Sequence, residues 1–167
     1  IDATGARTTN DYDAAGRMTA ATDASGRRTE YDYDANGNRT KVTTAAGTPQ
    51  AMSTVTTYDA LNRATRIDWP DGGSQSVVFR TDGRKQSETD PRGVTATYGY
   101  DATGRLISVQ QSGVAAATTY TYDQTGAKTT QTDAKNNRAA WSFDAAGRPA
   151  SRTLPDGWRA DEANPSG

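Results

Sequence analysis

A short segment that recurs at a fixed period constrains this chain more than any other feature. Residues Tyr12–Arg17 read Tyr-Asp-Ala-Ala-Gly-Arg, and this segment returns six more times with small changes. The aromatic residues that begin these segments, called anchor residues below, are Tyr12, Tyr33, Tyr58, Phe79, Tyr100, Tyr122 and Phe143. The steps between them are 21, 25, 21, 21, 22 and 21 residues. Such fixed-period self-similarity indicates a repeat architecture.

A second turn signal lies about halfway between successive anchor residues. Glycine recurs in turn-like contexts with steps that are mostly 10 or 11 residues, and Asn62 and Asn137 stand where glycine is expected. Turn signals at this spacing predict many short strands in an all-β fold. No helical apolar periodicity occurs. We therefore expect one β-hairpin per repeat and a long antiparallel meander.

The Asp that follows most anchor residues suits a tight turn. Its side chain can accept a hydrogen bond from the backbone N–H two residues on, and glycine in the fourth position can adopt the left-handed conformation that closes a three-residue loop with a bulge. The turn glycines predicted after the anchor residues are Gly16, Gly37, Gly83, Gly104, Gly126 and Gly147. In such a loop the Asp lies opposite the Arg four residues later. The expected ion pairs are Asp13–Arg17, Asp59–Arg63 and Asp101–Arg105.

Composition argues against an ordinary hydrophobic core and against several kinds of chemistry. Leu, Ile, Val and Phe together number 15 of 167 residues, but the formal net charge is only −1, and disorder requires a high net charge as well. The absence of Cys and His removes disulfides, thiolate metal sites and the commonest general base. No apolar run approaches the roughly 18 residues of a membrane span. Arg residues follow the repeat and are balanced by Asp, so no basic surface for nucleic acid is indicated.

The aromatic residues predict how the sheet is built. Pairs two residues apart, such as Tyr31/Tyr33 and Tyr120/Tyr122, share one face of a strand. Their rings would form one apolar stripe, with Arg residues of the return strands in cation–π contact. The remaining positions are mostly polar or small, and both edges of such a sheet would be open. We therefore expect a curled sheet that further repeats of a longer chain continue at both ends.

Several boundaries and irregularities follow from the repeat. We expect the repeat segment to span residues 1–159, with about seven repeats, and residues 160–167 to form a polar tail or linker. The terminal turns are expected at Asp2–Gly5 and Leu154–Gly157. Four extra residues are expected in the loop around Gly47–Gln50, and a second irregularity at Val114–Thr119. Because Ile1 lies within a repeat, both ends are expected to be cuts in a longer protein.

The units Tyr12–Arg17 and Tyr100–Arg105, with the half-period turn Trp69-Pro70-Asp71-Gly72, resemble the YD repeats of the Rhs (rearrangement hotspot) superfamily. The resemblance covers residues 1–159. In that family the repeats wind as a strand spiral into a large hollow shell. In bacterial Rhs and polymorphic toxins, and in the C component of insecticidal toxin complexes, the shell encloses a C-terminal toxin; teneurins use a similar shell in cell-surface adhesion.

This resemblance implies that the chain is a segment of shell wall, either secreted or exposed on a bacterial surface. The partners that it implies are further repeats of the same longer chain, an enclosed toxin, and a shell-closing or secretion-apparatus partner. It implies no nucleic acid partner, membrane span or cofactor.

Two further motifs fit a turn better than a functional site. Asp32–Asn38 resembles the start of a calcium-binding loop, but Thr43 stands where an EF-hand needs a bidentate Glu. Asp90–Gly93 resembles the cleavage motif of toxin-releasing family members, but Val94 replaces Leu and the segment lies in register with the half-period turns.

The sequence thus predicts a non-enzymatic wall that sequesters a toxic cargo, with no catalytic residue and no metal site. The turn Asp residues face Arg and backbone amides, which lower a carboxyl pKa, whereas acid catalysis needs it raised. The alternative is a cell-surface adhesion or carbohydrate-binding repeat, because aromatic residues beside Asp and Asn can bind sugars.

Overall fold

A computed structural model describes residues 7–155 and 159–160, the latter two as backbone only. The chain divides into two compact units. Unit 1 comprises residues 1–78 and 89–93, and unit 2 comprises residues 79–88 and 94–167.

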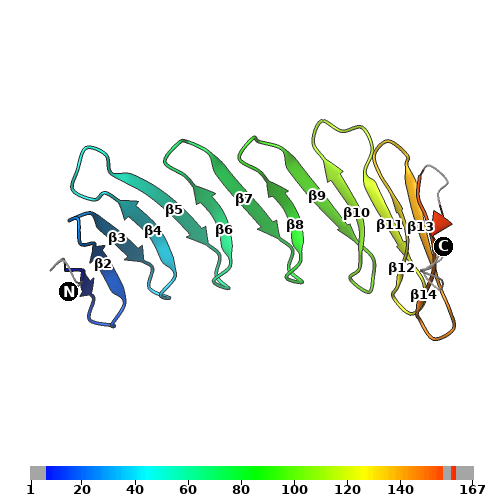
Figure 1. The fold of residues 1–167 in the computed structure, drawn as a ribbon, viewed down its shortest axis with the longest axis horizontal. Helices are drawn as coiled ribbons and strands as arrows, with labels where there is room; N and C mark the ends of the chain where they lie inside the picture. Colours follow the sequence, from blue (N-terminus) through cyan, green and yellow to red (C-terminus); the bar gives the residue numbers. More distant parts are fainter. Residues whose placement is uncertain (1–6, 156–158, 161–167) are drawn as a thin grey trace. The chain divides into compact units, whose positions relative to one another are not determined.

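Unit 1 is a run of antiparallel strands in chain order. Each strand pairs antiparallel with the one that follows it, from the first strand with the second to the sixth with the seventh (Figure 1). The strands are β1 (Thr9–Tyr12), β2 (Met18–Thr22), β3 (Arg28–Tyr33), β4 (Arg39–Thr44), β5 (Met52–Tyr58), β6 (Ala64–Asp68) and β7 (Ser74–Phe79).

Unit 2 repeats the same arrangement. Its strands are β8 (Lys85–Thr89), β9 (Thr95–Tyr100), β10 (Leu106–Gln111), β11 (Thr118–Tyr122), β12 (Lys128–Thr132), β13 (Arg138–Phe143), β14 (Pro149–Thr153) and β15 (Arg159–Ala160). From β9 to β15 each strand pairs antiparallel with the next. No helix occurs among the described residues. The predicted all-β antiparallel meander is confirmed.

Two kinds of turn connect the strands, and within each unit they lie at opposite ends of the hairpins (Figure 1). The anchor turns follow the anchor residues and span 13–17, 34–38, 59–63, 80–84, 101–105, 123–127 and 144–148. The half-period turns span 23–27, 45–51, 69–73, 90–94, 112–117 and 133–137. In the first anchor turn Gly16 N donates to Asp13 O at 3.0 Å, and Asp13 N donates to Arg17 O at 2.9 Å. The pairing register shifts beside Tyr12, which marks the predicted bulge.

One of the two predicted asparagine turn positions is wrong by one residue. Asn62 has the expected positive φ of 60°, but in the later turn it is Asn136, with a φ of 66°, rather than Asn137. Asp133 starts that turn, and Asn136 N donates to Asp133 O at 2.9 Å. Asn136 is therefore the fourth residue of the turn, and Asn137 takes the place that Arg17 has in the first anchor turn.

The longer loop between β4 and β5 lies where the four extra residues were expected. Ala45 and Gly47 both have positive φ, and Ala46 N donates to Arg28 O at 2.9 Å. The irregularity near Val114 lies in the half-period turn between β10 and β11. The terminal turn at Asp2–Gly5, the end of the turn at Leu154–Gly157 and the tail at 161–167 fall outside the described residues.

The sheet has almost no buried interior. Among the described residues only Ala20 and Ala46 are buried hydrophobic side chains, with 1% and 8% of their surface exposed. Ala20 pairs with Asp11 on one side and Glu30 on the other, and Arg28 bonds both carboxylates at 2.9 Å. The Arg28 side chain therefore passes over Ala20. The aromatic residues of the strands, apart from Tyr12, are only partly exposed. Their burial against neighbouring hairpins, together with the polar contacts between those hairpins, must therefore carry much of the stability.

Candidate functional site

The anchor turns are held by a dense set of hydrogen bonds and ion pairs. In the first one the Asp13 carboxylate accepts the backbone N–H groups of Ala15 and Arg17 through Oδ1, both at 2.9 Å. Its Oδ2 accepts Arg17 Nε at 2.7 Å. The same bonds recur in the Asp59–Arg63 and Asp101–Arg105 turns, with ion pairs of 2.7 Å. The predicted carboxylate turns and cross-strand ion pairs are confirmed.

These hydrogen bonds fix the charge state of the turn carboxylates. The pKa of Asp13 is lowered from its ordinary value of 3.8, first by the backbone N–H of Arg17 and then by its guanidinium. In Asp59 the guanidinium of Arg63 is the larger cause of the lowered pKa. Asp34 lies in a turn without Arg, and there the side-chain amide of Asn38 lowers its pKa. Carboxyl groups held ionised in this way are poor general acids at neutral pH.

The Arg of an anchor turn also reaches the next hairpin. Arg17 Nη1 donates to Asp34 O at 3.0 Å, and its guanidinium carbon lies 4.9 Å from the centroid of the Tyr33 ring. The Tyr33 hydroxyl in turn donates to Met18 O at 2.8 Å. We call this set of contacts the bridge: an Arg on an aromatic ring, the Arg on a carbonyl of the next turn, and the ring hydroxyl on a carbonyl of the preceding hairpin.

The same bridge occurs in unit 2. Arg105 Nη1 donates to Asp123 O at 3.0 Å, and its guanidinium carbon lies 5.0 Å from the centroid of the Tyr122 ring. The Tyr122 hydroxyl donates to Leu106 O at 2.7 Å. The predicted cation–π contact is confirmed in both units. The two hydrogen bonds to main-chain carbonyls were not predicted.

Other bridges are incomplete because the sequence differs. Asn38 replaces the turn Arg, and its Nδ2 donates to Asn62 Oδ1 at 2.7 Å in the next anchor turn. Ala127 provides no guanidinium and Phe143 no hydroxyl, and near them Lys128 Nζ lies 4.5 Å from the Trp141 ring centroid.

The structure places every predicted anchor residue and turn glycine. Each anchor residue is the last residue of an odd-numbered strand, from Tyr12 in β1 to Phe143 in β13. The turn glycines have positive φ angles of 79° at Gly16, 88° at Gly37, 86° at Gly83, 88° at Gly104, 93° at Gly126 and 76° at Gly147.

Gly104 is constrained by a close neighbour as well as by its φ. A side chain there would overlap the Arg84 guanidinium, which lies 5.7 Å from the centroid of the Tyr100 ring. The residue must therefore lack a Cβ for Arg84 to keep this position.

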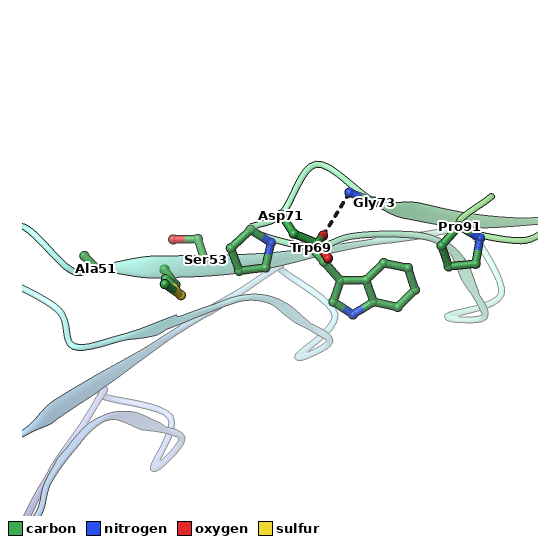
Figure 2. A pocket seen from close by; sticks show the side chains of 8 residues that line it. Ala51, Ser53, Trp69, Asp71, Gly73 and Pro91 are labelled. Atoms are coloured by element: carbon green, nitrogen blue, oxygen red, sulfur yellow. Dashed lines mark hydrogen bonds between the residues drawn. The ribbon is translucent and has the colours of Figure 1, made fainter. Parts of the chain in front are cut away.

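A pocket of about 750 Å³ lies at the half-period turn of unit 1 between β6 and β7. Figure 2 shows the Trp69 ring extending from the strand in the direction of Pro91, with Ser53 on β5 and Ala51 in the turn just before it. Asp71 Oδ1 accepts Gly73 N at 2.9 Å beside it. This pocket was not predicted from the sequence, although the Trp-Pro pair in a turn marks one wall of it.

The two motifs that resembled other sites form turns. The Asp34 carboxylate accepts the backbone N–H groups of Asn36 and Asn38, both at 2.9 Å. Asp90 O accepts Gly93 N at 2.9 Å, and its carboxylate pairs with Arg92 at 2.7 Å. Within the described ranges no group of three or more acidic, His or Cys side chains could hold a metal ion. The described part of the chain also contains no helix with the length and hydrophobicity that crossing a membrane requires.

A hairpin that is fixed to the next by an Arg, a ring and two carbonyls defines a class of β-hairpin repeat protein. The family described as RHS Repeat matches residues 1–28, 12–49 and 81–115, which together make up half of the chain. The chain belongs to this family. No curated protein matches it in sequence.

Solved structures share the fold at low sequence identity. A structure of the Photorhabdus luminescens Tc holotoxin pore with a TccC3 mutation matches 93% of this chain at 18% identity and a TM-score of 0.67. A crystal structure of TcdB2-TccC3-Cdc42 matches 95% at 16% identity and the same TM-score. The match covers only 9% of each of those chains. The likeness establishes the fold, and this chain spans a small part of those proteins.

Proposed function

We propose that this chain is a segment of the wall of a hollow shell that encloses a toxin in a secreted bacterial protein, with no catalytic role of its own. The observation that carries this proposal is the bridge between hairpins. It allows a sheet with hardly any buried interior to grow one hairpin at a time, as a long wall requires. The anchor residues and turn glycines are its structural sites.

Containment is the proposed mechanism. Strand ladders make each unit continuous, and the sheet face opposite the aromatic stripe carries small hydroxyl groups in unit 2. Ser142 Oγ lies 2.8 Å from Ser151 Oγ, and Thr121 Oγ1 lies 2.6 Å from Thr130 Oγ1. Such a surface would hold an unfolded cargo through many small hydroxyl groups, without a binding site specific to one cargo.

The proposal names three partners: further repeats of the same longer chain, the enclosed toxin, and a shell-closing or secretion-apparatus partner. Its support is the family membership together with the fold shared with Tc toxin structures. The protein would be exported from the bacterium or held at its surface.

The test is protease protection of the cargo in the complete protein that contains this chain. We expect the cargo to resist digestion in the parent and to become accessible when Tyr33 and Tyr122 are both changed to Ala, because two bridges are lost. Gln124→Ala, an exposed turn change without a bridge contact, is the matched control. If the cargo were digested as fast in the folded parent as in the variant with both Tyr residues changed, the proposal would be contradicted.

The pocket at Trp69 favours a second candidate function, carbohydrate binding. An aromatic ring beside the Asp71 carboxylate and the Ser53 hydroxyl offers a stacking surface and polar partners for a sugar (Figure 2). A glycan array would show a binder that Trp69→Ala loses. An array without any binder would remove this candidate and leave the wall proposal intact.

A further inference from the structure

We propose that Asn36 is a site of spontaneous deamidation that loosens the contact between two neighbouring hairpins. Asn36 is the only one of the seven asparagines that is followed by glycine. It lies in the anchor turn 34–38 of unit 1 with an exposed side chain. This inference is independent of the proposed function, since it rests on the chemistry of one turn.

The reaction needs only water. The backbone nitrogen of Gly37, after losing its proton to hydroxide, attacks Asn36 Cγ and forms a C–N bond. The Cγ–Nδ2 bond breaks, ammonia leaves, and a five-membered succinimide remains. Water then opens either carbonyl of this ring and gives aspartate or isoaspartate. The net change is amide plus water to carboxylate plus ammonium.

Glycine makes this attack feasible because it has no Cβ to obstruct the approach of its nitrogen. At Gly37 the space for a Cβ is open, with no heavy atom within 4 Å. One bond opposes the reaction, because Gly37 N donates to Asp34 O at 3.1 Å. The turn must open at this bond before the nitrogen can attack, so the folded chain reacts more slowly than a free peptide. Asn38 and Asn62 precede Arg and lack the unobstructed nitrogen.

The site matters because Asn36 belongs to the amide contact that replaces a missing turn Arg. Asn36 Nδ2 donates to Asn62 Oδ1 at 3.1 Å, and Asn38 Nδ2 donates to the same oxygen at 2.7 Å. A carboxylate at position 36 has no hydrogen to donate, and it would face the Asn62 oxygen and lie beside the Asp34 carboxylate. Isoaspartate would also lengthen the turn backbone by one atom. Covalent changes of this kind alter charge and turn geometry together.

The experiment ages the folded chain in mildly alkaline buffer prepared with ¹⁸O-water and maps its peptides by mass spectrometry. We expect loss of the Asn36 amide before that of Asn38 or Asn62, with ¹⁸O incorporated at position 36 and the net charge moving from −1 to −2. We also expect the aged fraction to melt at a lower temperature than the fresh chain. The variant Asn36→Asp reproduces the new charge without the longer backbone, and so separates the two effects.

Two results would overturn the inference. One is retention of the Asn36 amide while another asparagine loses its own, and the other is an aged fraction that melts at the same temperature as the fresh chain. Both measurements use the unmodified sequence, so neither depends on a variant that fails to fold.

Discussion

Removing the Tyr122 hydroxyl should weaken one bridge and leave the rest of it in place. In Tyr122→Phe the ring and its contact with Arg105 at 5.0 Å remain, while the 2.7 Å bond to Leu106 O is lost. A hydrogen bond within a protein contributes about 0.5–1.5 kcal/mol net. We expect a loss of this size in the free energy of unfolding.

The matched control is Tyr12→Phe at the first anchor residue. The Tyr12 side chain is 58% exposed, and its hydroxyl accepts only a 3.4 Å bond from Asn10 among the contacts described. This change should leave stability nearly unaltered, because water can replace so long a bond. The two variants occupy the same position in different repeats and share the same chemical change.

The assay is equilibrium unfolding in urea followed by far-UV circular dichroism. For a chain of this length a loss of about 1 kcal/mol lowers the melting temperature by roughly 2–4 °C, which gives an independent thermal check. Adding Arg105→Ala to both parent and Tyr122→Phe closes a double-mutant cycle that measures coupling within the bridge. An unchanged Tyr122→Phe variant, or an equal loss in Tyr12→Phe, would refute the bridge as a source of stability.

Three further predictions follow from the turns. Gly104→Val should destabilise the chain by about 1–2 kcal/mol or more, because a residue with a Cβ is strained at positive φ, whereas Ala102→Val in the same exposed turn should be nearly neutral in urea unfolding. Ala127→Arg should raise stability by about 0.5–1 kcal/mol through a new contact with the Phe143 ring, and an unchanged urea midpoint would contradict this. The turn carboxylates have folded pKa values below the ordinary 3.8, so their contribution is complete above that pH and is lost as the pH falls through the folded values. The circular dichroism signal during acid titration should therefore stay constant down to about pH 4 and change below it. A transition near neutral pH would show that a different titratable group governs the stability.

The sequence predicted the hairpins because their determinants are local. An Asp that caps its own turn and a glycine with positive φ act within five residues, so their spacing marks each turn directly. The same rule gives Asn136 when the turn is counted from its Asp, because Asn136 is the fourth residue from Asp133 as Gly16 is from Asp13. The prediction of Asn137 followed the spacing between turns instead of this local count, and the two differ by one residue here.

Only the part of the bridge formed by two side chains was predicted. Arg and Tyr at fixed spacing indicated a cation–π contact, but Met18 O and Leu106 O are main-chain carbonyls that any residue could supply. The Trp69 pocket was missed for a related reason. Its walls come from three separate segments near Ala51, Trp69 and Pro91, and their proximity depends on the strand register.

The near absence of buried side chains has a consequence for how such a gene can change. When each hairpin is secured mainly by the one before and the one after it, no distant residue has to be rematched if a unit is added or removed. Unequal crossing-over that inserts or deletes a whole period should therefore yield a protein that still folds, whereas an event that splits a period separates an Arg from its ring. Length variation among relatives should then fall in whole repeats.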